Sequence, residues 1–213
     1  MAVREGKDRH SMVIKNTKKI SDSFMENISY MDRTLPVGKS FDLIKRTIEI
    51  GERKAVLYFI DGFVKDEAML KLMDSFMGVT KEAMPKEAEM FSQRHVPYIE
   101  VDVLKDFDQV LRNVLSGVTC LFIEGYAACI AIDTRTYPAR SVEEPDKDKS
   151  LRGSRDGFVE TIVFNTALMR RRIRDEHLIM EMTEAGQTSR TDIAICYMLS
   201  LIHISEPTRL GMI

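Results

Sequence analysis

The chain has 213 residues, of which 44% are hydrophobic and 30% are charged, a composition typical of a folded globular protein and too apolar for a disordered one. The 31 basic and 33 acidic residues give a formal net charge of −2, so no overall basic field would attract nucleic acid. We therefore expect one large domain or two small ones, and no nucleic-acid partner.

Cysteine usage and hydropathy indicate the compartment. Cys120, Cys129 and Cys196 form no Cys-x-x-Cys pair and lie in apolar runs, which favours buried, reduced thiols in a cytosolic protein. The best apolar runs, 118–132 and 193–204, are interrupted by a glutamate or too short for the roughly 20 consecutive apolar residues of a membrane span. The N-terminal region lacks the apolar stretch of a signal peptide. As given, the sequence is expected to be soluble.

Residues 1–23 carry six basic residues against three acidic ones, so we predict a flexible basic tail. A weak attraction of this tail to anionic lipid or nucleic acid is the alternative. Residues 24–133 then carry the pattern of a globular fold, and we predict a first mixed α/β subdomain there. Its expected strands are 43–50, 54–60, 98–104, 118–123 and 127–133, and its expected helices are 65–77, 80–94 and a segment that Asp106 caps and that ends before Gly117.

A charged linker is predicted over 134–155, because ten of its 22 residues are charged and two prolines interrupt it. Residues 156–198 are expected to begin a second α/β subdomain that is cut short. The predicted fold class is therefore α/β, with two small mixed α/β subdomains joined by a charged linker and the second incomplete. Its expected elements are a helix from about 157 to 174 with Asp156 as its cap, and strands over 178–183 and 191–198 around a turn at Gly186.

The end of the chain, from Leu199 to Ile213, closely resembles the peptide obtained when a sequencing adapter is translated at the end of a read. We interpret 199–213 as an artefactual tail, with a natural polar C-terminal tail as the alternative. On this interpretation the natural protein continues beyond Met198 through the rest of the second subdomain into several apolar segments of about 20 residues each.

Signatures of catalysis or metal binding are scarce. No Gly-x-Ser-x-Gly, His-Glu-x-x-His or Walker motif is present. Asp61-Gly62 and Glu124-Gly125 each follow an apolar strand and are interpreted as turns. We therefore expect no enzymatic activity, no cofactor and no metal. No metal-ligand spacing connects the four histidines, His10, His95, His177 and His203.

The predicted helix after Asp156 is the unusual element. A segment rich in arginine and glycine, 152–157, precedes it and could hold an anion, but it lacks the phosphate-loop lysine and spacing, so a solvated loop or an interface is favoured. The helix has Val159 and Ile162 on one side and Phe164 and Leu168 on the other. Apolar residues on opposite sides favour burial against two partners.

Arginines end this helix and are spread around its axis by consecutive turns. They are either solvated or form ion pairs at a contact between subdomains or subunits, a role for which arginine is well suited. Their expected acidic partners lie in the charged linker, at Glu143, Glu144, Asp146 and Asp148. The candidate interface residues are Arg152, Arg155, Asp156, Glu160, Arg170, Arg171, Arg172 and Arg174.

Three segments around this helix carry a family resemblance, namely 137–146, 151–160 with its motif Arg155-Asp-Gly-Phe-Val-Glu160, and 164–175 with its arginine run. They strongly resemble the A subunits of bacterial spore germination receptors of the GerA type. Two earlier segments, 37–42 and 59–66, are most similar to the AF-type sporulation paralogues of that family. The resemblance covers about residues 24–198.

The resemblance implies the cytosolic N-terminal region of a membrane protein of endospore-forming bacteria, built of two α/β subdomains ahead of a transmembrane bundle that this sequence lacks. In that family, A subunits are thought to assemble with other subunits, and into homo-oligomers, as ion channels of the spore inner membrane. AF-type members are linked to ion release during germination. No catalytic residue is known for the family, which agrees with the scarcity of catalytic motifs.

We therefore expect a role in the assembly of a germination receptor or an ion-release channel complex. The alternatives are a small cytosolic α/β enzyme or nucleotide-binding protein, and an adaptor that only docks other proteins. A convergent pair of titratable groups in a deep pocket would favour the enzyme, whereas an apolar or arginine-rich contact surface would favour assembly.

Overall fold

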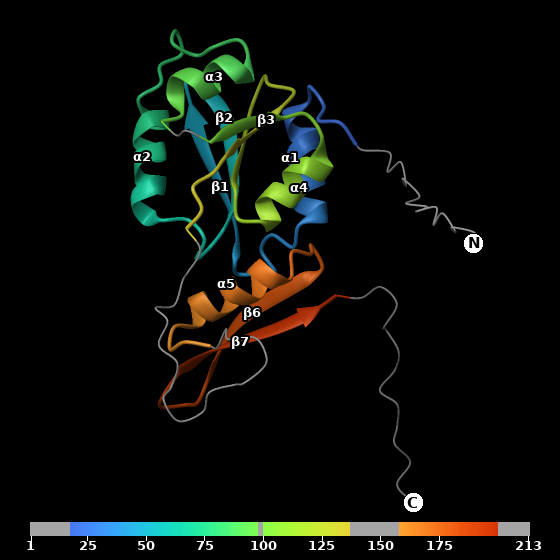
Figure 1. Ribbon diagram of the computed structural model, residues 1–213, viewed down its shortest axis with the longest axis vertical. Coiled ribbons are helices and arrows are strands. Elements are labelled where there is room, and N and C mark those ends of the chain that lie inside the picture. The colour runs from blue at the N-terminus through green and yellow to red at the C-terminus, as the bar shows by residue number, and fades with distance from the viewer. Residues whose placement is uncertain (1–17, 98–99, 137–157, 200–213) are drawn as a thin grey trace, which may run out of the picture.

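Figure 1 shows the computed structural model, which describes residues 18–97, 100–136 and 158–199. The described residues form a five-stranded sheet with helices on both faces, followed by a helix and a two-stranded sheet. We call residues 18–136 the first unit and residues 158–199 the second unit. The predicted mixed α/β fold class is confirmed.

The large sheet is antiparallel throughout, with the strand order β1-β2-β4-β5-β3. Every residue of β4 and β5 is buried, because both strands lie inside the sheet and helices cover both faces. This burial explains why these two strands are continuous apolar runs. The strands are β1 (Leu43–Ile50), β2 (Arg53–Ile60), β3 (Val101–Leu104), β4 (Thr119–Ile123) and β5 (Cys129–Ile132).

Two helical layers cover the sheet, and alternate residues of each strand face one layer or the other. Val56 and Tyr58 of β2 pack with α1 (Phe24–Thr34) and α4 (Phe107–Leu115). Their neighbour Leu57 packs with α2 (Asp66–Met77) and α3 (Ala88–His95). Figure 1 shows α2 and α3 on the side of the sheet opposite α1 and α4. The period of two along the strands therefore builds two apolar cores, one on each side of the sheet.

Both ends of α4 follow local sequence signals. The carboxylate of Asp106 accepts a hydrogen bond from the Gln109 N–H at 2.9 Å, which confirms the predicted cap. At the other end the Val118 N–H donates to the Asn113 carbonyl at 2.9 Å, and Gly117 adopts a φ of 95°. This is a Schellman motif, in which a left-handed residue follows the helix. A Cβ at this glycine would collide with the Phe63 ring.

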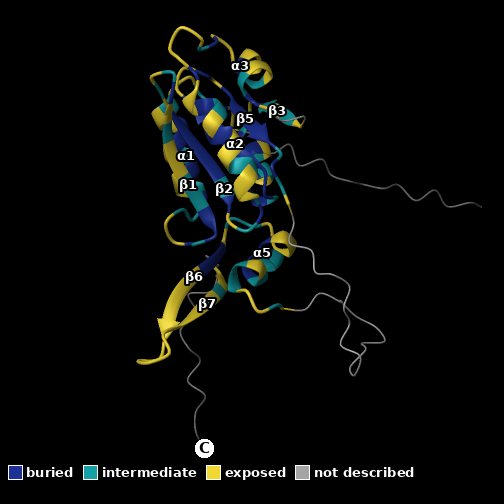
Figure 2. Cartoon of the chain, turned by 90° about the vertical axis from the view of Figure 1, so that its left-hand side faces the viewer, coloured by how far each residue is buried: buried dark blue, intermediate teal, exposed yellow. Residues whose placement is uncertain are grey.

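The second unit contains α5 (Ile162–Arg172), β6 (Leu178–Ala185) and β7 (Thr191–Met198). The two strands form an antiparallel hairpin that pairs Leu178 with Met198. Leu178, Ile179 and Met180 are buried, whereas the remainder of β6 is exposed. Figure 2 shows this difference between the buried five-stranded sheet and the exposed end of the hairpin.

Two predicted helices differ from those observed. The helix predicted over 80–94 is α3, which begins only at Ala88. Pro85 lies in the preceding turns, and a proline interrupts helical hydrogen bonding. The helix predicted over about 157–174 is α5, which begins at Ile162 after Thr161. Its predicted cap, Asp156, lies outside the described residues.

The edges of the predicted segments also differ in part. Residues 18–23, predicted to belong to the tail, pack against the rest of the first unit, because the Ile20 N–H donates to the Lys105 carbonyl at 3.0 Å. At the start of the predicted linker, the Thr136 N–H donates to the Phe63 carbonyl at 2.7 Å. Of the predicted linker the structure describes only residues 134–136. Within the described parts of the chain, no helix is both long enough and apolar enough to cross a membrane.

Candidate functional site

The second unit meets the first at one end of the large sheet, where α5 crosses the turn after β2. Gly62 in this turn has a φ of 79°, and a Cβ there would lie 3.1 Å from the Ala167 Cβ and 3.2 Å from Val163 Cγ1. The small residues of the turn and of α5 therefore allow a close approach of the two backbones. Ala167 is buried in the same apolar core as α1 and α4.

Arg170 lies on this buried face of α5 and is 0% exposed. Its Nε donates to Asp42 Oδ2 at 2.7 Å and its Nη2 donates to Asp42 Oδ1 at 3.1 Å, a bidentate pair. The carboxylate is 1% exposed and lies immediately before β1. A buried ion pair thus joins two residues that are separated by 128 positions in the sequence.

Two further hydrogen bonds hold the Arg170 guanidinium to its own unit. Nη1 donates to the Asp175 carbonyl and Nη2 to the Leu178 carbonyl, both at 2.9 Å. These carbonyls lie just after α5 and at the start of β6. They orient the guanidinium toward Asp42, so the chain immediately after the helix positions the arginine.

Ser40 is the second polar residue of the first unit that forms hydrogen bonds with the second unit. Its hydroxyl donates to Asp42 Oδ1 at 2.5 Å and accepts from the Met180 N–H at 2.9 Å. The Phe41 N–H donates to the Met180 carbonyl at 2.9 Å, so the backbone before β1 pairs with β6 across the contact. We call this group of Ser40, Phe41, Asp42, Arg170 and Met180 the Arg170 junction.

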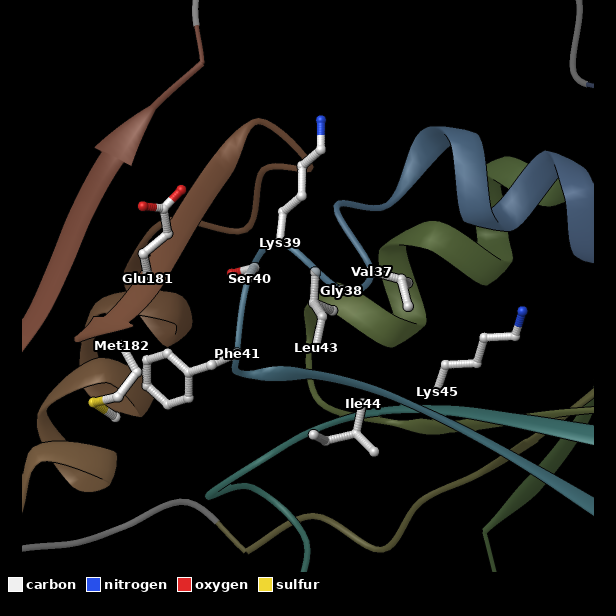
Figure 3. A pocket seen from close by; sticks show the side chains of 10 residues that line it. All are labelled: Val37, Gly38, Lys39, Ser40, Phe41, Leu43, Ile44, Lys45, Glu181 and Met182. Carbon is white, nitrogen blue, oxygen red and sulfur yellow. The ribbon is translucent and has the colours of Figure 1, made fainter. Parts of the chain in front are cut away.

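A groove of about 730 Å³ opens beside the junction, with walls from both units. Figure 3 shows Phe41 next to Met182 on one side, and Lys45 on the other. Lys45 forms an ion pair with Asp32 at 2.6 Å. The lining contains no histidine or cysteine, and its one hydroxyl, that of Ser40, is already hydrogen-bonded to Asp42 and to the Met180 N–H. The lining residues are Val37, Gly38, Lys39, Ser40, Phe41, Leu43, Ile44, Lys45, Glu181 and Met182.

Asp175, Glu176 and His177 are grouped closely enough for their side chains to approach one cation. His177 is exposed, and its ring Nδ1 lies 2.8 Å from an Asp175 carboxylate oxygen. The backbone N–H of His177 donates to that same oxygen and is the main cause that lowers the pKa of Asp175. This oxygen is therefore already occupied within the loop, and the group serves as a turn between α5 and β6.

The turn interpretations of the two acid-glycine pairs are confirmed. Asp61 accepts a hydrogen bond from the Gly62 N–H at 2.9 Å through its side chain. Glu124 accepts one from the Lys54 N–H at 3.3 Å, and Gly125 has a φ of 88°. Both carboxylates are exposed and support the backbone of their turns.

The predicted interface residues have different positions. Arg170 is part of the junction, whereas Arg171, Arg172 and Arg174 are exposed at the end of α5. Glu160 is exposed just before the helix. Arg152, Arg155 and Asp156 lie outside the described residues. So do the predicted acidic partners in the linker, Glu143, Glu144, Asp146 and Asp148.

For Arg170, the expectation of a partner in the acidic linker was wrong, because its carboxylate partner is Asp42. The apolar pattern also predicted other buried faces for this helix, one with Val159 and Ile162 and one with Phe164 and Leu168. The residues of α5 that are buried are Thr166, Ala167 and Arg170, none of them a large apolar residue. Ser40 and Asp42 were not predicted as site residues. The sequence feature that could have identified them is Asp42 itself, an isolated acid directly before the apolar start of a strand.

A family model described as Bacillus/Clostridium GerA spore germination protein matches residues 30–205, which include both Asp42 and Arg170. The chain belongs to the GerA spore germination family. The match extends into the segment that we interpret as artefactual. Of that segment the structure describes Leu199, whose N–H donates to the His177 carbonyl at 2.8 Å.

Two curated relatives of Bacillus subtilis (strain 168) show how much of a GerA family protein is present. Stage V sporulation protein AF is 38% identical over 173 residues, which cover 81% of this chain and 35% of that protein. Spore germination protein KA is 29% identical over 182 residues, which cover 84% of this chain and 33% of that protein. The chain therefore spans about a third of the length of these relatives.

A solved structure shares the fold. It is the N-terminal domain of the A subunit of the Bacillus megaterium spore germinant receptor GerK3, with a TM-score of 0.65 and 21% sequence identity. The similarity covers 86% of this chain and 68% of that one. The GerA family fold is thus shared between this chain and a receptor subunit.

Proposed function

We propose that this chain is the N-terminal, cytosolic region of a germination A-subunit-like protein and that it acts in the assembly of a germination complex of the spore inner membrane. Its membership of the GerA family carries the proposal. The fold shared with a receptor A-subunit domain supports it. In this role the region binds other subunits, or further copies of its own full-length protein, and performs no catalysis.

The identity to Stage V sporulation protein AF exceeds that to spore germination protein KA. This difference supports an AF-type protein, and hence a complex that releases ions, over a nutrient-receptor subunit. The 29% identity to spore germination protein KA keeps the receptor subunit as the second candidate.

The exposed face of α5 is our candidate contact surface. Phe158, just before the helix, is 71% exposed and Phe164 is 44% exposed. Arg171, Arg172 and Arg174 are exposed near the C-terminal end of the same helix. Exposed aromatic residues beside arginines are the combination that protein interfaces favour. We therefore propose this face of α5 as the contact surface for another subunit.

Charge reversal at this face tests the proposal. In the full-length protein, Arg171→Glu with Arg172→Glu should prevent the protein from co-purifying with its complex and should slow germination. The matched control is Lys71→Glu with Arg112→Glu, which changes the same charge at exposed positions of the first unit. Normal assembly and germination with both reversals at α5 would contradict the proposal.

A further inference from the structure

The contact between the two units includes both polar and apolar groups. The hydrogen bonds that cross it include three from Arg170 to Asp42 and Ser40, and two between the backbone of Met180 and the pair Ser40 and Phe41. The α5 side chains that meet the Gly62 turn, Val163 and Ala167, are short. Directional hydrogen bonds and one ion pair therefore help to specify the position of the second unit, beside the apolar contact of Ala167.

Each half of the ion pair keeps partners within its own unit. The Arg170 guanidinium retains the Asp175 and Leu178 carbonyls, and both lie in the second unit. Asp42 retains the Ser40 hydroxyl, which lies in the first. If the units separated, water would replace only the bonds that cross the contact. Neither unit would have to unfold to expose its charge.

A buried ion pair allows few intermediate arrangements. A small displacement would leave both charges desolvated and unpaired, which is much less favourable than either full pairing or full hydration. Full pairing and full hydration are therefore the two stable arrangements of this contact. An apolar contact of the same size would instead tolerate small displacements.

From this geometry we infer that the Arg170 junction is a two-state contact, closed in the structure described and able to open so that the second unit leaves the first as an intact body. Opening breaks the bonds of Asp42 and Ser40 to Arg170 and Met180 and leaves the large sheet folded. This inference concerns the folded chain and does not depend on the proposed function.

Native-state hydrogen exchange of the unmodified 213-residue chain in low concentrations of urea tests the inference directly. The Phe41 and Met180 N–H groups report on the contact, since both donate across it. Leu57, in the interior strand β2 between β1 and β4, reports on unfolding of the sheet. We expect Phe41 and Met180 to exchange at similar rates, at least about tenfold faster than Leu57. Equal exchange at all three amides would overturn the inference, because the units would then open only by global unfolding.

Substitution of the arginine provides the second test. Arg170→Met should speed exchange at Phe41 and Met180 at least about tenfold, because Asp42 is then left buried without its charge partner, while Leu57 is unchanged. The control Arg174→Met removes an exposed arginine whose Nε donates to the Arg171 carbonyl within the second unit, and it should leave all three amides unchanged. Unchanged exchange at Phe41 and Met180 in Arg170→Met, or an equal rise at Leu57, would overturn the inference.

The double variant Arg170→Met with Asp42→Leu is the third test, because it removes both charges and leaves apolar groups in their place. We expect it to restore slow exchange at Phe41 and Met180 to about the rate of the unmodified chain or below. Fast exchange in this variant would mean that the ion pair is not what holds the contact closed. If either variant fails to fold, the exchange of the three amides in the unmodified chain still tests the inference.

Discussion

Arg170 and Asp42 form a bidentate ion pair at 2.7 and 3.1 Å, and at most 1% of either side chain is exposed. Exposed pairs in the same chain are different, as at Lys105 and Glu89, whose atoms lie 3.1 Å apart with 72% and 48% of the side chains exposed. Water screens the second pair, and two long side chains lose rotamer freedom to form it. Only the first therefore fixes how two parts of the chain are arranged.

A double-mutant cycle should measure this difference. With Asp42→Asn and Arg170→Met, we expect a coupling energy of about 2–5 kcal/mol in the free energy of junction opening, obtained from exchange of the Met180 amide. The reference cycle, Glu89→Gln with Lys105→Met, should give at most about 1 kcal/mol in urea unfolding. Similar coupling in both cycles would mean that burial adds nothing to the Arg170 pair.

The close approach at Gly62 predicts a separate effect. Gly62→Ala should weaken the contact by about 1–3 kcal/mol, because the new methyl group meets Ala167 and Val163 and the φ of 79° is strained for alanine. Gly38→Ala is a matched control, since Gly38 has a φ of 78° but nothing within 4 Å of an added Cβ.

The two glycine variants separate strain from collision. Gly38→Ala should lower the free energy of unfolding by about 1 kcal/mol through strain alone. Only Gly62→Ala should also speed exchange of the Met180 amide. Equal effects of the two variants on that amide would show that α5 does not rest on the turn.

The thiols should differ in reactivity. Cys120 and Cys129 are fully buried, and burial raises the pKa of Cys129 well above its ordinary value. Cys196 is half-buried on β7, and burial also raises its pKa. A thiol-specific reagent at neutral pH should therefore react slowly with Cys196 alone in the folded chain, and with all three thiols in denaturant. The control Cys196→Ser should abolish the native reaction, and labelling of Cys120 in the native chain would contradict the burial of the core.

Acid should weaken the first unit through Asp133. The Arg135 Nε donates to Asp133 Oδ1 at 2.8 Å, and this side-chain bond is the main cause that lowers the pKa of the carboxyl. Since the pKa is lower in the folded than in the unfolded state, the stabilisation is fully present above the ordinary pKa of about 3.9 and is lost as the pH falls through the lowered value.

The matched variant is Asp133→Asn, which lacks this titration. The free energy of unfolding of the unmodified chain, measured in urea, should exceed that of Asp133→Asn at about pH 5, and the difference should shrink towards about pH 2. A difference that stays constant over this range would rule out the ion pair as its source.

The sequence predicted those parts of the fold that short-range patterns determine. β4 and β5 are continuous apolar runs because both of their faces are buried, and Asp106 caps α4 by a contact three residues away. The start of α3 was predicted too early, since helical periodicity outweighed Pro85. Local preference and hydrophobic period thus account for most of the first unit.

The Arg170 junction could not be predicted in the same way. The pairing of Arg170 with Asp42 depends on how the second unit lies against the first, whereas sequence proximity favoured the acidic linker. The buried face of α5 is also formed by Thr166, Ala167 and Arg170, which a search for apolar residues does not identify. A buried arginine is recognised only when its carboxylate and carbonyl partners are in place.

The ion pair between positions 42 and 170 also constrains how the sequence can change over generations. A neutral residue at either position alone leaves a desolvated charge at the other, so the first of two successive replacements is selected against even where the final pair would be tolerated. Members of the GerA family that have this contact should therefore retain both charges or have lost both. In an alignment of such sequences, these two distant columns should covary more strongly than column 170 does with its exposed neighbours at 171 and 172.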